Sequence, residues 1–152
     1  MIWRLLAAAA GLALLAPPVA LADARAAEPE ALLRQYVELW NAGDAEAISS
    51  KIYRLPPTHP FATRAGLEAE FTRLREVGYR RSVTHALEGC LLTPTQAMVQ
   101  LRFTRLKTDG APLGPKDRAT LYLVRKFPEG WRITDLIGMS PTARLTCTSA
   151  TE

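Results

Sequence analysis

Two polar side chains, His85 and Asp135, stand among apolar residues on what the sequence predicts to be one face of a β-sheet. A histidine oriented by a carboxylate is an arrangement that transfers protons or activates a nucleophile. The two residues fall on the first and the fourth of four consecutive predicted strands. With about 4.8 Å between neighbouring strands, they lie roughly 14 Å apart. We therefore expect them to face one cavity from opposite sides. The alternative is that each is a rim residue whose polar atoms are satisfied by backbone or water.

Other residue patterns that carry chemistry do not occur in the sequence. It has no glycine-rich phosphate loop, no nucleophile elbow and no Cys/His spacing typical of a metal site. Its 2 histidines fall in different predicted elements, which argues against a zinc site. Basic residues interleaved with aromatic ones are too sparse for a nucleic-acid surface. We predict no cofactor, no metal and no nucleic-acid partner.

Helical patterns occupy the first half of the chain that follows the N-terminal segment. Pro29 suits the first position of a helix, because the amide hydrogen that proline lacks would have no partner there. The helix is predicted to run to Ala42, because apolar residues recur along it at spacings of three and four. Asp44 is a candidate cap for a second helix, and a third helix follows Thr63 and stops at Gly78. The three helices precede all the predicted strands.

From Ser82 onward apolar residues recur at every second position, which indicates strands. Four are predicted, at Ser82–Leu92, Gln96–Lys107, Arg118–Phe127 and Trp131–Ile137. Their short connections favour an antiparallel meander, so the fold class is α+β, with three N-terminal helices packed on a curved four-stranded antiparallel sheet. Alternation assigns to the helix-covered face Val83, His85, Leu87, Gly89, Val99, Leu101, Phe103, Leu121, Leu123, Trp131, Ile133 and Asp135. To the outer face it assigns Thr84, Glu88, Gln100, Arg102, Thr104, Thr120, Tyr122, Val124, Arg132 and Thr134.

The first 22 residues are typical of a cleavable signal peptide. Arg4 precedes an apolar run of about 12 residues, shorter than the roughly 20 that a membrane-spanning helix needs. A small-residue cleavage site, Ala20-Leu21-Ala22, follows. We predict export to the periplasm or the medium, with an uncleaved anchor as the alternative, and no membrane span in the mature chain. The expected organisation is signal peptide 1–22, leader 23–28, domain 29–138 and C-terminal tail 139–152.

Export bears on the two cysteines, Cys90 and Cys147. An even number of cysteines in an oxidising compartment favours pairing, so we predict a disulfide that tethers the tail. Two unpaired thiols are the alternative. Loss of Arg4 with the signal peptide lowers the formal charge of +4 by one. The dispersed basic residues are expected to be solvated, or else to attract an anionic surface or ligand. They are Arg73, Arg75, Arg80, Arg81, Arg102, Arg105, Lys107, Lys116, Arg118, Arg125, Lys126 and Arg132.

Two stretches of sequence resemble the nuclear transport factor 2-like superfamily, which includes ketosteroid isomerases and polyketide-cyclase-like proteins. They are QYVELWNAGD at residues 35–44 and GWRI at residues 130–133, and they occur within the same order of elements. The resemblance covers roughly residues 30–138. It implies a cone-shaped fold with a pocket between the first helix and the sheet. It does not imply one function, because this fold hosts isomerases, cyclases, dehydratases and adaptors.

The ketosteroid isomerases offer a comparison residue by residue. Tyr36 matches their oxyanion-holding tyrosine, and His59, before Pro60, stands where their proton-moving aspartate precedes a proline. Leu123 occupies the place of their second oxyanion donor, and a leucine donates no hydrogen bond. Loss of one such donor costs on the order of a hundredfold in turnover, so we do not expect steroid isomerisation. The alternatives are a core role for Tyr36 and a surface position for His59.

Three hypotheses for function follow. The first is an exported, non-enzymatic domain that binds a small hydrophobic molecule or acts as an accessory module. The second is an isomerase- or cyclase-type enzyme in which Tyr36 donates a hydrogen bond and His59, His85 or Asp135 carries the proton. The third is a homodimer paired through the outer sheet face at Tyr122 and Val124. The predicted pocket residues are Tyr36, Trp40, His85, Phe103, Leu121, Leu123, Trp131 and Asp135.

Overall fold

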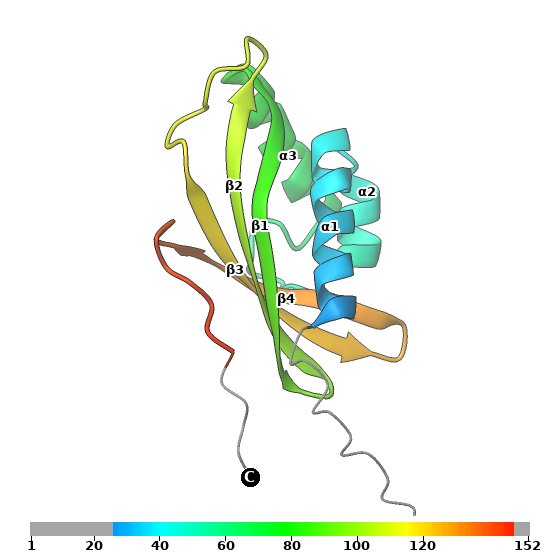
Figure 1. The fold of residues 1–152 in the computed structure, drawn as a ribbon. Coiled ribbons are helices and arrows are strands. Elements are labelled where there is room, and N and C mark those ends of the chain that lie inside the picture. Colours follow the sequence, from blue (N-terminus) through cyan, green and yellow to red (C-terminus); the bar gives the residue numbers. More distant parts are fainter. Residues whose placement is uncertain (1–25, 148–152) are drawn as a thin grey trace, which may run out of the picture.

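A bent, four-stranded antiparallel sheet is the frame of the protein in the computed structural model, which describes residues 26–147 (Figure 1). The predicted signal peptide and residues 23–25 of the predicted leader lie outside these residues. The strands follow one another in space as they do in the sequence: β1 (Tyr79–Thr93), β2 (Gln96–Lys107), β3 (Arg118–Phe127) and β4 (Gly130–Met139). The predicted α+β meander is confirmed. Within the described residues, no helix has the length and apolar character needed to cross a bilayer.

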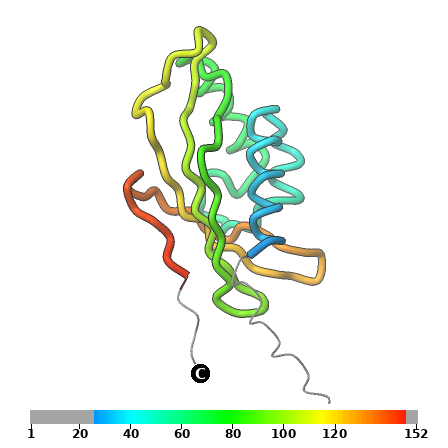
Figure 2. The backbone as a smooth tube through the Cα atoms, viewed as in Figure 1, coloured from blue at the N-terminus to red at the C-terminus, as the bar shows by residue number. Residues whose placement is uncertain are grey.

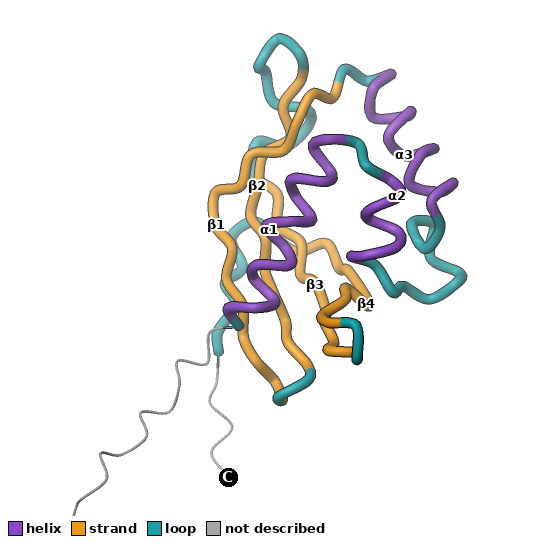
Figure 3. Tube along the Cα trace, turned by 90° about the vertical axis from the view of Figure 1, so that its right-hand side faces the viewer, coloured by secondary structure: helices purple, strands orange, loops and turns teal. Residues whose placement is uncertain are grey.

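All the helices pack on one side of the sheet, which we call the inner face; the opposite side is the outer face (Figure 3). They are α1 (Ala27–Ala42), α2 (Ala45–Ala47), a π-helical turn η1 (Ile48–Ile52) and α3 (Arg64–Glu76). The hydrophobic core fills the space between these helices and the inner face. Its fully buried side chains include Leu33, Ile48, Ile52, Leu67, Leu74, Val99 and Ile133.

The helix ends form where the sequence supplies capping residues. Gly43 has a φ of 69°, a left-handed conformation that glycine adopts without strain, and it ends α1. The Asp44 carboxylate then accepts a hydrogen bond from the amide of Ala47 at 2.9 Å and starts α2. The Thr63 hydroxyl accepts one from the amide of Gly66 at 3.1 Å and starts α3. These caps set the direction in which each helix crosses the sheet.

The predicted facing of β3 is wrong. Tyr122 pairs with Val99, and Val124 pairs with Ala97, so these residues share the inner face with the buried residues of β2. Leu121 and Leu123 therefore point to the outer face. The odd-numbered and the even-numbered positions of β3 both carry apolar residues, so alternation alone does not show which of them the helices cover. Because Tyr122 and Val124 are buried beneath the helices, they cannot pair two copies of the chain.

Bulges correct the predicted facing of two further strands. On β1, Thr84 pairs with Phe103 and Ala86 with Arg102, which leaves His85 as an extra residue. Before this bulge the outward positions are the odd-numbered ones, so Val83 also points outward. On β4, Asp135 pairs with Leu123 and Ile133 pairs with Val124, so β4 has one extra residue, a bulge, between these two pairs. The bulge places Asp135 on the outer face, together with Leu123.

The C-terminal segment, residues 140–147, runs along the outer face, on the side of the sheet opposite α1 (Figure 2). The predicted disulfide is confirmed: Cys90 of β1 is bonded to Cys147, with 5.4 Å between the Cα atoms. Gln100 of β2, which is buried, adds a second attachment. Its amide group donates to the carbonyl of Ala143 at 3.1 Å and accepts from the amide of Leu145 at 3.2 Å. We call this tethered segment the C-terminal strap.

Candidate functional site

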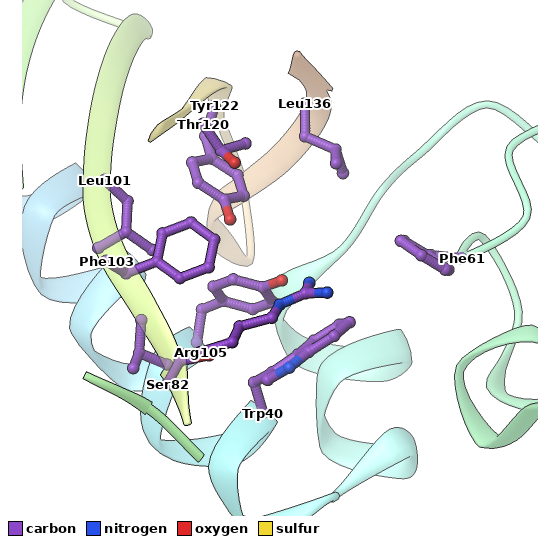
Figure 4. Close-up of a pocket in the computed structure, with 11 residues that line it drawn as sticks. Trp40, Phe61, Ser82, Leu101, Phe103, Arg105, Thr120, Tyr122 and Leu136 are labelled. Atoms are coloured by element: carbon purple, nitrogen blue, oxygen red, sulfur yellow. The ribbon is translucent and has the colours of Figure 1, made fainter. Parts of the chain in front are cut away.

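A small cavity of about 70 Å³ lies on the inner face, between α1, the connector that follows η1, and the sheet (Figure 4). Most of its wall is aromatic or aliphatic. The polar groups in the wall are few: a guanidinium, two tyrosine hydroxyls and the hydroxyls of a serine and a threonine. The lining residues are Tyr36, Val37, Trp40, Phe61, Ser82, Leu101, Phe103, Arg105, Thr120, Tyr122 and Leu136.

Arg105 brings a positive charge into this cavity. Its side chain extends from β2 into the ring of lining residues (Figure 4). The guanidinium carbon lies 6.0 Å from the centre of the Trp40 ring and 5.9 Å from that of Phe103, within range of weak cation–π attraction. Its buried Nε has no hydrogen-bond partner, and no carboxylate within residues 26–147 forms an ion pair with it. The cavity therefore holds a cation without its counter-ion.

Three buried tyrosines lie beside Arg105. Tyr53 follows the π-helical turn η1, and its backbone is held against β4 through a bridge to Ile133. This position lets the Tyr53 hydroxyl donate a hydrogen bond to the Tyr36 hydroxyl at 2.9 Å. The rings of Tyr36 and Tyr122 meet edge-on at 5.5 Å. Because the Tyr36 hydroxyl accepts from Tyr53, it keeps one proton to donate, either to the neighbouring Tyr122 hydroxyl or to a ligand oxygen.

These tyrosines are neutral at physiological pH. Burial raises the pKa of Tyr36 well above the usual value, and the neighbouring Tyr53 raises it further, while the charge of Arg105 partly offsets the rise. Burial likewise raises the pKa of Tyr122 and of Tyr53. A neutral phenol in an apolar site donates and accepts hydrogen bonds but does not act as a base. The cluster therefore supplies polar contacts rather than a nucleophile.

Of the predicted pocket residues, only Tyr36, Trp40 and Phe103 line the cavity. Trp131 is buried elsewhere, at the start of α1, where its indole N–H donates to the Glu28 carboxylate at 2.7 Å. The others, His85, Leu121, Leu123 and Asp135, lie on the outer face for the reasons given above.

None of the three predicted proton carriers lines the cavity. His59 stands behind its wall: its Nδ1 accepts from the amide of Phe61 at 3.1 Å, and its ring packs against the Phe61 ring. His85 shares a hydrogen bond with Thr104 at 2.6 Å on the outer face. The Asp135 carboxylate accepts from the next backbone amide at 2.8 Å. In the described part of the chain, no three His, Cys, Asp or Glu side chains are grouped to hold a metal ion.

Arg105 is the functional candidate that sequence reasoning missed. Its position carried a usable signal, because the alternation of Val99, Leu101 and Phe103 continues to residue 105 and assigns it to the inner face. An arginine near a strand end is usually solvated, so composition gave no reason to single it out. Tyr53 had no comparable signal, because only the π-helical turn brings it to Tyr36.

Solved structures with the same architecture are similar to this chain over most of its length. An NTF2-like protein with a cystatin-like fold from Novosphingobium aromaticivorans has 19% sequence identity and a TM-score of 0.55, covering 74% of this chain and 79% of its own. A domain of unknown function with a cystatin-like fold from Nostoc punctiforme has 21% identity and a TM-score of 0.55, covering 80% of each chain. A Catenulispora acidiphila protein in complex with S-DNPA has 14% identity and a TM-score of 0.54, covering 74% of this chain and 90% of its own.

These identities are low, so the structural likeness shows the fold and not the function. The comparison with curated proteins returned no match. Family membership rests instead on the sequence of residues 27–141, which matches the family described as NTF2-like protein (DUF6841). That match begins with α1, ends just after β4 and includes every lining residue of the cavity. The chain belongs to this NTF2-like family.

Proposed function

We propose that the protein is an exported, non-enzymatic binding domain whose inner cavity takes a small organic acid. The observation that carries the proposal is the guanidinium of Arg105, which enters an aromatic cavity without a carboxylate partner among the described residues. A charge in apolar surroundings is costly unless an opposite charge meets it. A ligand carboxylate would supply that charge and accept two parallel hydrogen bonds from the guanidinium fork.

The rest of the cavity matches the other end of such a ligand. Trp40, Phe103 and Leu136 offer apolar surface, and the Tyr36 hydroxyl can turn its one proton from Tyr122 to a ligand oxygen. The volume of about 70 Å³ is below the roughly 300–1,000 Å³ of sites for drug-sized ligands. The ligand is therefore an acid of few heavy atoms. A larger acid would require Phe61, which comes from the proline-containing connector, to move outward.

Binding is favoured over catalysis by the positions of the proton carriers. General acid–base catalysis needs a group within hydrogen-bond reach of the reacting atom, and His59, His85 and Asp135 all lie outside the cavity. Tyr36 with its raised pKa stays protonated and cannot take up a proton. Export is supported by the sequence of residues 1–22 and is compatible with the Cys90–Cys147 disulfide.

Calorimetric titration with pairs of probes that differ only in charge tests this proposal. The pairs are propionate with propionamide and benzoate with benzamide. We expect each acid to bind at least about tenfold more tightly than its amide, a difference of about 1.4 kcal/mol. The variant Arg105→Met keeps the apolar stem and removes the charge, so it should abolish this preference. Arg125→Met is the matched control, because Arg125 is exposed on β3, away from the cavity.

The outcomes separate cleanly. Equal affinity for acid and amide would show that the cavity does not recognise charge and would overturn the proposal. So would an equal loss of acid binding in Arg105→Met and Arg125→Met, because the attraction would then come from the net positive charge. Conversion of a bound acid, followed by NMR, would restore the enzyme hypothesis in its place.

A further inference from the structure

A second hollow lies on the outer face, on the opposite side of the sheet from the cavity. Its volume is about 290 Å³. One wall comes from the strands and the loop before β3, and the other wall is the C-terminal strap. It is lined by His85, Arg102, Asp117, Arg118, Pro141, Thr142 and Arg144.

Three arginine residues line this hollow. Arg118 starts from the inner face of β3, opposite Phe103, and its Nη2 donates to the carbonyl of Leu113 at 3.0 Å. Arg102 comes from β2, Arg118 from the start of β3 and Arg144 from the strap, while Asp117 supplies one carboxylate. The lining therefore carries a formal charge of +2 with His85 neutral. The only ion pair among these groups within residues 26–147 joins Arg102 to Glu88 at a long 3.9 Å.

Two guanidinium nitrogens of these arginines lack a hydrogen-bond partner within residues 26–147. They are the buried Nε atoms of Arg102 and Arg118. A buried donor without an acceptor is unfavourable, and more so in a charged group. Burial also lowers the pKa of Arg118, and the nearby Arg105 lowers it further. Arg144 is oriented by hydrogen bonds of 3.1 Å from its Nη1 to the carbonyls of Pro141 and Ala143. The site is thus built and is short of negative charge.

His85 is held in the wall by a chain of hydrogen bonds. The single proton of the Thr104 hydroxyl is donated to the carbonyl of Lys116. The Thr104 oxygen must then accept from His85, so the imidazole Nε2 carries a proton. This contact fixes the imidazole ring at the edge of the hollow, where the bulge of β1 places His85.

We propose that this hollow binds a phosphate-type oxyanion, either free phosphate or the phosphate group of a small monoester. Guanidinium forks match tetrahedral oxyanions through paired, charge-assisted hydrogen bonds, which a single ammonium group does not provide. A dianion balances the formal charge of the lining. The hollow is larger than a bare phosphate, so it also has room for a short organic group.

Titration of the disulfide-bonded mature protein with inorganic phosphate tests the proposal. We expect a Kd of about 1 mM or lower at moderate ionic strength, and Arg144→Gln or Arg102→Gln should weaken binding by about tenfold or more. Arg125→Gln is the control, because it removes an equal charge from an exposed position of the same sheet. Asp117→Asn should change affinity in the other direction and tighten binding by a few fold, because it removes the one carboxylate of the lining.

Probes of different size separate the two sources of the phosphate group. Tighter binding of glycerol 3-phosphate than of inorganic phosphate would identify a monoester, and the reverse would identify the free ion. Acetate at the same concentration should bind at least about tenfold more weakly than phosphate, because it brings one charge instead of two. A thermal melt of each variant shows that it is folded; Arg144 is exposed, so its variants should melt like the parent protein.

Three results would overturn the proposal. One is the absence of phosphate binding at concentrations about ten times the expected Kd. Another is an equal loss in Arg125→Gln and Arg144→Gln, which would trace the affinity to diffuse charge. The third is unchanged or weaker binding in Asp117→Asn. None of these results bears on the inner cavity, because Arg144 and Asp117 do not line it.

Discussion

The inner cavity and the outer hollow lie on opposite faces of the same sheet and differ in the charges of their lining. On the inner face one guanidinium, that of Arg105, stands among aromatic rings and neutral tyrosine hydroxyls. The outer hollow is lined by three arginines and one aspartate. A lone cation in apolar surroundings suits a ligand with one charge and an apolar body. A cluster of cations suits a compact ligand with two charges.

The two sites also differ in what holds them together. Helix packing and a hydrogen bond between Tyr53 and Tyr36 shape the inner cavity, so it depends on the hydrophobic core. The outer hollow depends on the strap, which is attached by the Cys90–Cys147 disulfide and by Gln100. We infer that changes to the strap should affect the outer site selectively, while changes to the tyrosines should affect the inner one.

Removal of the disulfide should have the largest effect. The variant Cys90→Ala with Cys147→Ser opens a loop with a sequence separation of 57 residues. In the chain-entropy model this lowers the free energy of unfolding by about 4 kcal/mol, measured by chemical denaturation. Phosphate affinity should fall as well, because Arg144 lies three residues before Cys147. Organic-acid binding in the folded variant should stay within about twofold of the parent; an equal fall at both sites would refute their separation.

Loss of the second strap attachment should have an intermediate effect. Gln100→Leu leaves the Ala143 carbonyl and the Leu145 amide without their side-chain partner, which should cost about 1–2 kcal/mol in the free energy of unfolding. Phosphate should bind more weakly while the disulfide stays intact. Leu121→Ala changes a half-buried outer-face residue that does not bond the strap, and it serves as the comparison for a general loss of packing. If it lowers phosphate affinity as much, Gln100 does not act through the strap.

The third prediction concerns the inner face alone and, taken as the share of a single tyrosine, is the smallest. The pKa of Tyr36, Tyr53 and Tyr122 is raised by folding, so each keeps its proton at a pH where the unfolded chain loses it. Their stabilising contribution is complete below about pH 10 and is lost as the pH rises further, by up to about 1.4 kcal/mol per pH unit for each tyrosine. Unfolding free energies measured between about pH 8 and 11 should therefore show this loss only above about pH 10.

Tyr36→Phe should reduce this slope by the share of one tyrosine, although it also costs stability at neutral pH because Tyr53 loses its acceptor. Tyr79→Phe is the matched control. Tyr79 is only half-buried, and its pKa is raised less than those of the inner tyrosines. An identical slope in the parent and in Tyr36→Phe would mean that Tyr36 ionises as readily in the folded protein as in the unfolded one.

Much of the fold could be predicted because it depends on local patterns. The strands β2 and β3 have the predicted bounds, Gln96–Lys107 and Arg118–Phe127, since turn residues flank both. The caps Asp44 and Thr63 also act as expected. The disulfide needed no geometry, because a chain with 2 cysteines offers only one internal pair.

The candidate sites were predicted less well, and the reason is the facing of the strands. Tyr36, Trp40 and Phe103 line the inner cavity, because helical spacing and a bulge-free strand fix the direction of their side chains. His85 and Asp135 were assigned to the inner face because alternation was continued through two bulges that leave no mark in the composition.

The amino-acid sequence by itself determined the order of helices and strands, the family and the disulfide, since these follow from periodicity, capping residues and the number of cysteines. Only the tertiary structure decided which chemistry the two faces carry. On β3 the alternating sets Leu121 with Leu123 and Tyr122 with Val124 are equally apolar, so packing against the helices chose between them. That choice, together with the bulges, placed Arg105 in an aromatic cavity and moved His85 from the supposed pocket to a separate arginine-lined hollow.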